Sequence, residues 1–151
     1  MKTRMYIDTS VVGGFFDEKF EKETKLLFEQ MEKGKVIFLV SDLLLKELEY
    51  APEKVRRLLE KYPPECFEAV EITEDAKELA NYYIAEKVIG ETSYDDCLHI
   101  AIATINKVDV LASWNFKHIV NINRIRGYNS VNMKNGYATL EIRNPRDLVE
   151  L

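Results

Sequence analysis

The sequence has few cysteines, glycines and prolines, and it lacks long apolar runs. Two cysteines, Cys66 and Cys97, are too few for a disulfide framework and leave no second pair for zinc. With 6 glycines, 4 prolines and no repeat or low-complexity tract, the chain is neither fibrous nor disordered in composition. No apolar run approaches the roughly 20 residues that cross a bilayer, and the first residues lack a signal-peptide core. We expect one globular domain over residues 1–151, cytoplasmic and without a membrane partner.

Charge is distributed unevenly, although the net charge of -5 argues against a protein that coats nucleic acid non-specifically. Residues 1–113 contain 15 Lys and Arg against 23 Asp and Glu, whereas residues 114–151 contain 6 against 3. Aromatic residues are interleaved with these late cations, a combination that can contact phosphates and stack on bases. Six cations over this length are also typical of an ordinary solvated surface. The basic segment therefore predicts an RNA contact only if other evidence supports one.

Strand-like and helix-like segments alternate along the chain. Strands are expected within residues 4–12 and at 35–41, 67–73, 108–113 and 137–143. Helices are expected at 20–31, 43–50, 52–59, 74–88 and 95–106, after Trp114 over a short stretch, and from Pro145. Gly34 and Gly90 are expected to end helices, and Ser41 or Asp42 to cap one. This alternation predicts an α/β fold, a three-layer α/β/α sandwich with a mainly parallel central sheet.

Three acidic residues stand near predicted strand ends or helix starts, where ligands bind in such folds. Asp8 follows the first strand, Glu47 lies in the helix after the second strand, and Asp96 lies near the start of a later helix. Apolar residues surround each of them. A shared Mg²⁺ or Mn²⁺ explains three acids in such positions, because these ions take oxygen ligands and carboxylates alone would repel one another.

Each acid also has a plainer structural interpretation. Asp8 can cap the next helix or hold a turn through its own backbone. Glu47 can form a surface salt bridge with Lys46 or Arg56. Asp96 can be a first-turn acid that the helix dipole favours. Each of these interpretations is reasonable alone, and the three together are less economical than one shared cation.

The motif order IDTS, SDLLLKELEY, SYDDCLHIAIAT and LASWNFKHI resembles that of the PIN-domain ribonucleases, the family that includes the toxins of VapBC toxin–antitoxin modules. The resemblance covers most of the chain. It places Asp8, Glu47 and Asp96 at the first three acidic positions of the family. Asp95 has no fixed counterpart, and it either assists the site or caps the helix.

The fourth acidic position departs from the family pattern. The family usually has an aspartate within a Thr-x-Asp-x-x-Phe stretch, and SWNFKH puts Ser113 at the threonine and Asn115 at the aspartate. An asparagine oxygen can ligate a metal or orient water, but it adds no charge and takes no proton. The resemblance therefore leaves open whether one metal or two are bound.

The resemblance implies a Mg²⁺- or Mn²⁺-dependent endoribonuclease with RNA as substrate, a homodimer, and an antitoxin as a further partner. Asp8, Glu47 and Asp96 are the implied metal ligands, and Asn115 completes the implied catalytic set. A PIN-like module that binds RNA or protein without catalysis is the alternative. A haloacid-dehalogenase-type phosphotransferase would need Asp-x-Asp, whereas position 10 is serine, and a zinc hydrolase would need a His-Glu-x-x-His pattern.

Hydroxyls and basic side chains near these motifs are expected to contact substrate. The hydroxyls can equally bond the carboxylates, or cap helices and turns. His99 is expected to be a packed or hydrogen-bonded core residue, since hard cations prefer oxygen, and Trp114 is expected to pack. The expected substrate-binding residues are Thr9, Ser10, Ser113, Lys117, His118, Arg124 and Arg126.

Overall fold

The computed structural model describes residues 2–90 and 93–149, and its centre is a five-stranded sheet. The strand order is β3-β2-β1-β4-β5, and each neighbouring pair is parallel. The predicted parallel sheet is confirmed. The strands are β1 (Thr3–Ile7), β2 (Val36–Ser41), β3 (Phe67–Val70), β4 (Val110–Ala112) and β5 (Ile142–Arg143).

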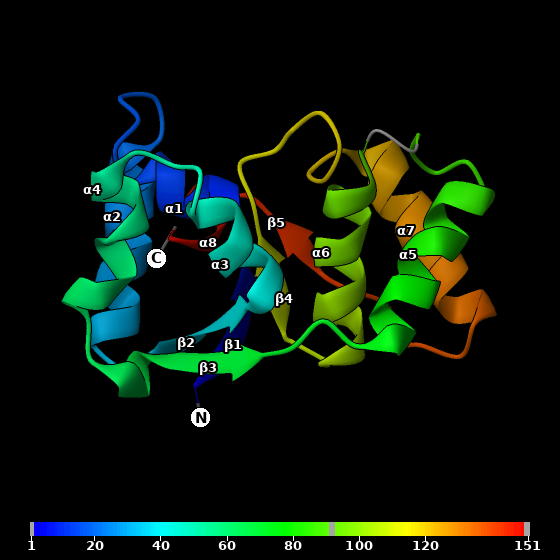
Figure 1. Cartoon of the computed structure of the whole chain (residues 1–151), viewed down its shortest axis with the longest axis horizontal. Coiled ribbons are helices and arrows are strands. Elements are labelled where there is room, and N and C mark those ends of the chain that lie inside the picture. Colours follow the sequence, from blue (N-terminus) through cyan, green and yellow to red (C-terminus); the bar gives the residue numbers. More distant parts are fainter. Residues whose placement is uncertain (1, 91–92, 150–151) are drawn as a thin grey trace.

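Helices cover both faces of the sheet, as parallel connections require (Figure 1). One layer contains α1 (Thr9–Gly14), α2 (Glu21–Glu32), α4 (Glu53–Arg56) and α8 (Pro145–Leu148). The other contains α5 (Glu74–Ala85), α6 (Tyr94–Ile105) and α7 (Ile122–Lys134). Helix α3 (Asp42–Leu48) follows β2 directly, and two short 3-10 helices, η1 (Leu58–Lys61) and η2 (Pro64–Cys66), precede β3. Among the described helices, none combines the length and apolar character needed to cross a bilayer.

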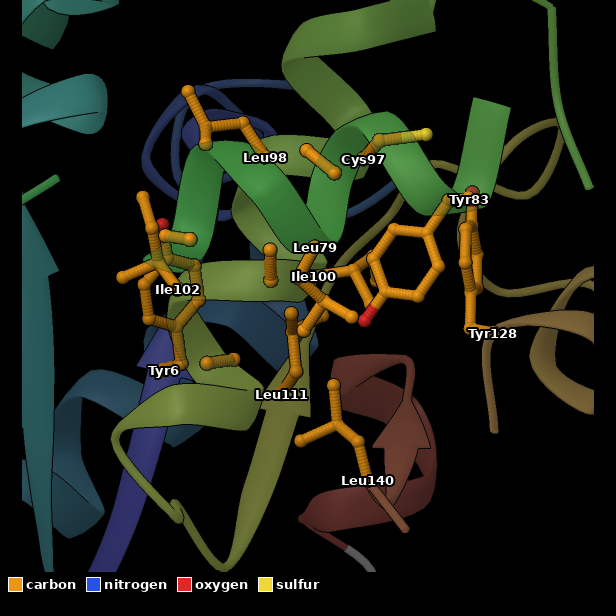
Figure 2. Packing of buried hydrophobic residues seen from close by; sticks show 14 of the residues in the cluster. Tyr6, Leu79, Tyr83, Cys97, Leu98, Ile100, Ile102, Leu111, Tyr128 and Leu140 are labelled. Atoms are coloured by element: carbon orange, nitrogen blue, oxygen red, sulfur yellow. The ribbon is translucent and has the colours of Figure 1, made fainter. Parts of the chain in front are cut away.

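The central strand β1 divides the hydrophobic core into two parts. Met5 and Ile7 pack toward α1 and α2, while Tyr6 between them packs toward α5 and α6, as the two-residue period of a strand dictates. Figure 2 shows the second part, where Tyr6 lies among apolar side chains of the sheet and helices, and where Tyr83 and Tyr128 pack edge to face. Because β1 is buried on both faces, the residue that follows it also starts inside the protein.

Several predicted segments differ in extent from the observed ones. The strands expected at 67–73 and 108–113 are shorter, Phe67–Val70 and Val110–Ala112, and residues 9–12 of the first strand-like segment lie in α1. Helix α5 ends at Ala85, because the left-handed residue that stops it is Lys87 (φ 61°) and not Gly90. The helix expected at 52–59 is divided into α4 and η1. The strand expected at 137–143 is only two residues long, Ile142–Arg143.

Helix α7 was not predicted. A short helical stretch was expected after Trp114, whereas the structure has turns at 116–119 and then a helix of 13 residues. Asn121 caps this helix by accepting hydrogen bonds from the amides of Asn123 and Arg124. Gly127 lowers the helix propensity of the segment, but a Cβ there would lie 2.8 Å from Val88 Cγ1. Close packing against the turn after α5 thus accounts for the glycine and overrides the local propensity.

Two adjacent glycines of α1 provide a matched test of packing near β1. A Cβ on Gly14 would lie 2.7 Å from Trp114 Nε1 and 3.0 Å from Thr24 Oγ1, two atoms that share a hydrogen bond of 2.8 Å. Gly14→Ala should therefore reduce the free energy of unfolding by about 1–3 kcal/mol. Around Gly13 no described atom lies within 4 Å of such a Cβ, so Gly13→Ala should gain about 0.5–1 kcal/mol from helix propensity. Urea unfolding measures both, and equal stability of the two variants would contradict this packing.

Candidate active site

Asp8 directly follows β1, and its side chain is buried, with 4% exposed. It caps α1 by accepting a hydrogen bond from the Val11 amide at 3.3 Å. The hydroxyls of Ser10 and Ser113 donate to Oδ1 and Oδ2 respectively, each at 2.6 Å. Burial raises the pKa of Asp8, although these hydrogen bonds oppose the shift. The capping interpretation of Asp8 is therefore correct, and the same carboxylate lies at the centre of a polar cluster.

Ser10 and Ser113 connect the start of α1 to the end of β4. Ser10 Oγ accepts from the Trp114 amide at 2.8 Å, and Ser113 Oγ accepts from the Asn115 amide at 2.9 Å. Each hydroxyl thus donates to the carboxylate of Asp8 and accepts from the backbone after β4. Of the alternatives left open for these serines, the bond to a carboxylate is observed, and their predicted contact with substrate stays a prediction.

Glu47 reaches the same region from α3. The Thr9 hydroxyl donates to its Oε1, and His99 Nε2 lies 2.7 Å from the same oxygen. Partial burial raises the pKa of Glu47, but the bonds from His99 and Thr9 outweigh burial and hold that pKa below its usual value. The alternative salt bridge to Lys46 or Arg56 is wrong, because neither residue forms a salt bridge with Glu47 in the described part of the chain, and Arg56 donates to the carbonyl of Ala51.

Asp96 lies in the first turn of α6, beside the exposed Asp95. Its Oδ1 accepts a hydrogen bond of 3.3 Å from Asn115 Nδ2. Burial raises the pKa of Asp96, and the negative charges of Asp8 and Glu47 raise it further. The three predicted acids are therefore brought into one electrostatic environment.

Asn115 is oriented by bonds to both ends of its amide. Its nitrogen donates to Asp96, and its Oδ1 accepts from the His118 amide at 3.0 Å. His118 Nδ1 is buried and has no hydrogen-bond partner within the described part of the chain. A buried ring nitrogen of this kind is a position where water or a ligand atom is expected.

The donor atoms suit a hard cation, but the full ligand set is not assembled. Within residues 2–90 and 93–149, no three His, Cys, Asp or Glu side chains are grouped closely enough to hold a metal ion. Mg²⁺ nevertheless needs only one or two carboxylates, because it retains several waters and takes substrate phosphate oxygens. The buried carboxylate of Asp8 and the half-buried one of Asp96 meet that requirement. The metal site stays a prediction.

The basic residues that were expected to contact substrate differ in their surroundings. The Arg124 guanidinium donates to the carbonyl of Val88, so it holds the turn after α5. Lys117 and Arg126 are exposed, and neither has a salt-bridge partner among the residues that the structure describes. Lys117 and Arg126 therefore have free exposed cations among the described residues, and their contact with substrate stays a prediction.

Sequence reasoning missed a hollow of about 670 Å³ beside the acids. Glu47 and Asp95 line it together with Tyr50, Tyr94 and Lys46. The Tyr50 side chain is 90% exposed, and an exposed tyrosine next to a lysine is a usual stacking element for a nucleobase. In the sequence, Tyr50 is only a single aromatic residue between Glu49 and Ala51, and such a position gives little indication of a function.

The raised pKa values of Asp8 and Asp96 predict that the metal-free protein loses stability as pH rises. Each protonated carboxyl contributes stability below its ordinary pKa of 3.8, and that contribution is lost as pH rises through the raised value. Asp96→Asn cannot ionise and keeps an oxygen for the bond from Asn115. In chelator, as the pH is raised above 3.8, the melting temperature of Asp96→Asn should fall less than that of the unmodified chain. Each 1 kcal/mol of difference in stability corresponds to about 2–4 °C in melting temperature.

Asp95→Asn is the matched control, because it removes an exposed charge from the adjacent position of the same helix. Its melting temperature should follow that of the unmodified chain at every pH. If Asp96→Asn follows the unmodified chain as well, burial does not act on the Asp96 carboxyl as described.

Comparison with known proteins identifies the fold. No protein-family model and no curated protein sequence matches the chain. DNA-bound VapBC from Salmonella typhimurium is similar in structure, with a TM-score of 0.58 and 17% identity over 96% of this chain and 99% of its own. VapBC2 from Rickettsia felis, bound to promoter DNA, is also similar in structure, with a TM-score of 0.59 and 15% identity over 94% of this chain and 98% of its own.

The toxin VapC20 of Mycobacterium tuberculosis, described as cleaving the sarcin-ricin loop, gives a TM-score of 0.58 and 13% identity over 75% of this chain and 91% of its own. At these sequence identities, structural similarity establishes the fold of this chain and not its activity. The strand order, the two helical layers and these similarities agree, so this chain has the fold of the VapC-type PIN domains.

Proposed function

We propose that this chain is a metal-dependent endoribonuclease, the toxin of a toxin–antitoxin pair, that hydrolyses RNA phosphodiester bonds with Mg²⁺ or Mn²⁺. The observation that carries the proposal is the meeting of Asp8, Asp96 and Asn115 at the carboxyl edge of a parallel sheet with the VapC-type fold. RNA as the substrate is supported by the likeness to VapC20, which is described as cleaving the sarcin-ricin loop.

Asp8, Glu47 and Asp96 would hold the cation in this proposal. A bound Mg²⁺ or Mn²⁺ supplies a water of lowered pKa and neutralises charge on a phosphate oxygen. Ser10 and Ser113 fix both oxygens of Asp8, so the cluster is organised before substrate arrives. This preorganisation lowers the reorganisation cost that a flexible carboxylate would add.

Other residues would position the RNA. Lys117 and Arg126 offer exposed cations, and Tyr50 and Tyr94 line the hollow beside Glu47. His118 is half-buried and lies near Asp96, so it is a further candidate for a phosphate contact. Phosphate contacts from the cations and stacking from the tyrosines would together hold a single strand across the acids.

Protein partners are also part of the proposal. Two of the similar structures are VapBC complexes bound to DNA, and this likeness supports a cognate antitoxin for this chain. We propose a homodimer as well. Ile122 and Met133 of α7 are exposed apolar side chains, 64% and 62% exposed, and such residues are common in protein interfaces.

A non-catalytic module with the same fold is the second candidate. Two observations favour it: Asn115 replaces the fourth acid, and no complete three-ligand metal site is formed within the described residues. Such a module would bind RNA or a protein, and Mn²⁺ or Mg²⁺ would act on it only through ionic strength.

Cleavage of mixed cellular RNA separates the two candidates. Purified protein is incubated with RNA in Mn²⁺, in Mg²⁺ or in chelator, and the cleaved ends are mapped. We expect cleavage only with metal, and a loss on the order of 10²-fold or more in Asp96→Asn, because the variant loses a ligand of the cation that would stabilise transition-state charge. Asp95→Asn, changed at the neighbouring exposed position, controls for loss of a charge on this helix and should retain most of the activity. Undiminished cleavage by Asp96→Asn would refute the assignment.

Asn115→Asp tests the departure from the family pattern. In the metal-free protein the variant lacks the hydrogen bond from Asn115 Nδ2 to Asp96, and its new carboxylate repels that of Asp96. We therefore expect a lower melting temperature in chelator, with about 2–4 °C for each 1 kcal/mol of stability lost. The added charge should attract a cation, so saturating Mn²⁺ should raise the melting temperature more than it does in the unmodified chain. A variant that responds to Mn²⁺ no more than the unmodified chain would show that Asn115 only orients its neighbours.

A further inference from the structure

A buried chain of hydrogen bonds leads from the core to the carboxylate of Glu47. His99 Nε2 lies 2.7 Å from Glu47 Oε1, and His99 Nδ1 lies 2.6 Å from the hydroxyl of Tyr6. That hydroxyl lies 2.8 Å from Ser41 Oγ, which accepts from the Leu44 amide at 3.1 Å. The chain links residues of β1, β2, α3 and α6, four elements of the fold.

Burial makes this chain costly unless each of its atoms is bonded. Tyr6 and Ser41 are fully buried and His99 is 2% exposed. Figure 2 shows that the Tyr6 side chain lies among apolar side chains. Replacing hydrogen-bonded partners in a core by apolar groups of similar shape is often nearly neutral for stability. The polar groups therefore contribute something other than packing, and the chain ends at Glu47.

The directions of the bonds follow from the donors and acceptors available. An ionised carboxylate only accepts, so His99 Nε2 carries the proton shared with Glu47. In the neutral ring Nδ1 then accepts, the Tyr6 hydroxyl donates to it, and the Ser41 hydroxyl donates to Tyr6. Tyr6 thereby selects the tautomer of His99 and fixes the rotation of its ring.

We propose that His99 is a positioning residue: held by Tyr6 and Ser41, it fixes the Glu47 carboxylate in the orientation that the cation and the RNA require. His99 and Thr9 both bond to Oε1 of Glu47, and Oε2 lies outside this pair of bonds. The Glu47 side chain is 29% exposed, so ligands from solvent can reach it. This role rests on the proposed function, because orienting Glu47 matters only if the acids bind a cation.

Two substitutions of His99 separate its two nitrogens. The amide nitrogen of glutamine reaches about as far as Nε2, whereas that of asparagine reaches only as far as Nδ1. His99→Gln therefore keeps a donor for Glu47, and His99→Asn keeps a polar group for Tyr6 alone. We expect His99→Asn to weaken Mn²⁺ binding by roughly 10-fold to 100-fold, as is usual when the support of a metal ligand is lost, and His99→Gln to restore most of it.

Mn²⁺ affinity is measured by calorimetric titration of the full chain, and RNA cleavage is measured alongside it. A purely structural role would lower the melting temperature of the two variants without separating their Mn²⁺ affinities. Tyr6→Phe is the second line of evidence, because it removes only the hydroxyl that fixes the ring. Like His99→Asn, it should weaken Mn²⁺ binding. It therefore tests the proposal independently if one of the His99 variants folds poorly.

The outcomes distinguish this proposal from the proposed function. If the unmodified chain binds Mn²⁺, Asp96→Asn does not, and His99→Asn binds like the unmodified chain, then His99 does not position Glu47 while the function stands. If His99→Gln and His99→Asn lose affinity equally, the positioning role is also refuted. If the unmodified chain neither binds Mn²⁺ nor cleaves RNA, both proposals are refuted together.

Discussion

A carboxylate buried at the end of the central strand is the constraint on which the site depends. Asp8 is 4% exposed, and within the described residues no basic side chain forms a salt bridge with it. Isolated buried charge costs several kcal/mol or more, and here the hydroxyls of Ser10 and Ser113 with the Val11 amide offset part of that cost. Under the proposed function, a divalent ion would neutralise the charge that the protein only partly stabilises.

The order of the strands determines which residues surround Asp8. β1 lies between β2 and β4, so the carboxyl end of β4 delivers Ser113 beside Asp8, and α3 after β2 delivers Glu47. Ligands collect at this edge in parallel sheets because the connections leave it open. The backbone topology therefore fixes which segments meet, and hydrogen bonds from hydroxyl, imidazole and amide groups fix how each carboxylate is held.

Much of the fold could be predicted from local patterns, and much of the site could not. Apolar runs bounded by caps and glycines indicate β1, β2, α2 and α3, because these signals are local, whereas α1 was not among the predicted helices. Helix α7 was hidden by the glycine and asparagines of its sequence, since packing at Gly127 stabilises it and packing is not local. The motif order indicated the acids, but the bond from Tyr6 to His99 joins residues 93 positions apart. Pairing of that kind depends on the folded structure, so no spacing in the sequence predicts it.

The most direct test of a cation at this edge is anomalous scattering from crystals grown with Mn²⁺. The proposed function predicts an anomalous peak beside the carboxylates of Asp8 and Asp96, and that peak should be absent from crystals of Asp96→Asn grown in the same solution. Such a peak would show that the partly stabilised charge of Asp8 is completed by a metal. Fully ordered Asp8 and Asp96 side chains at saturating Mn²⁺, with no anomalous peak beside them, would contradict a metal-dependent site in this protein.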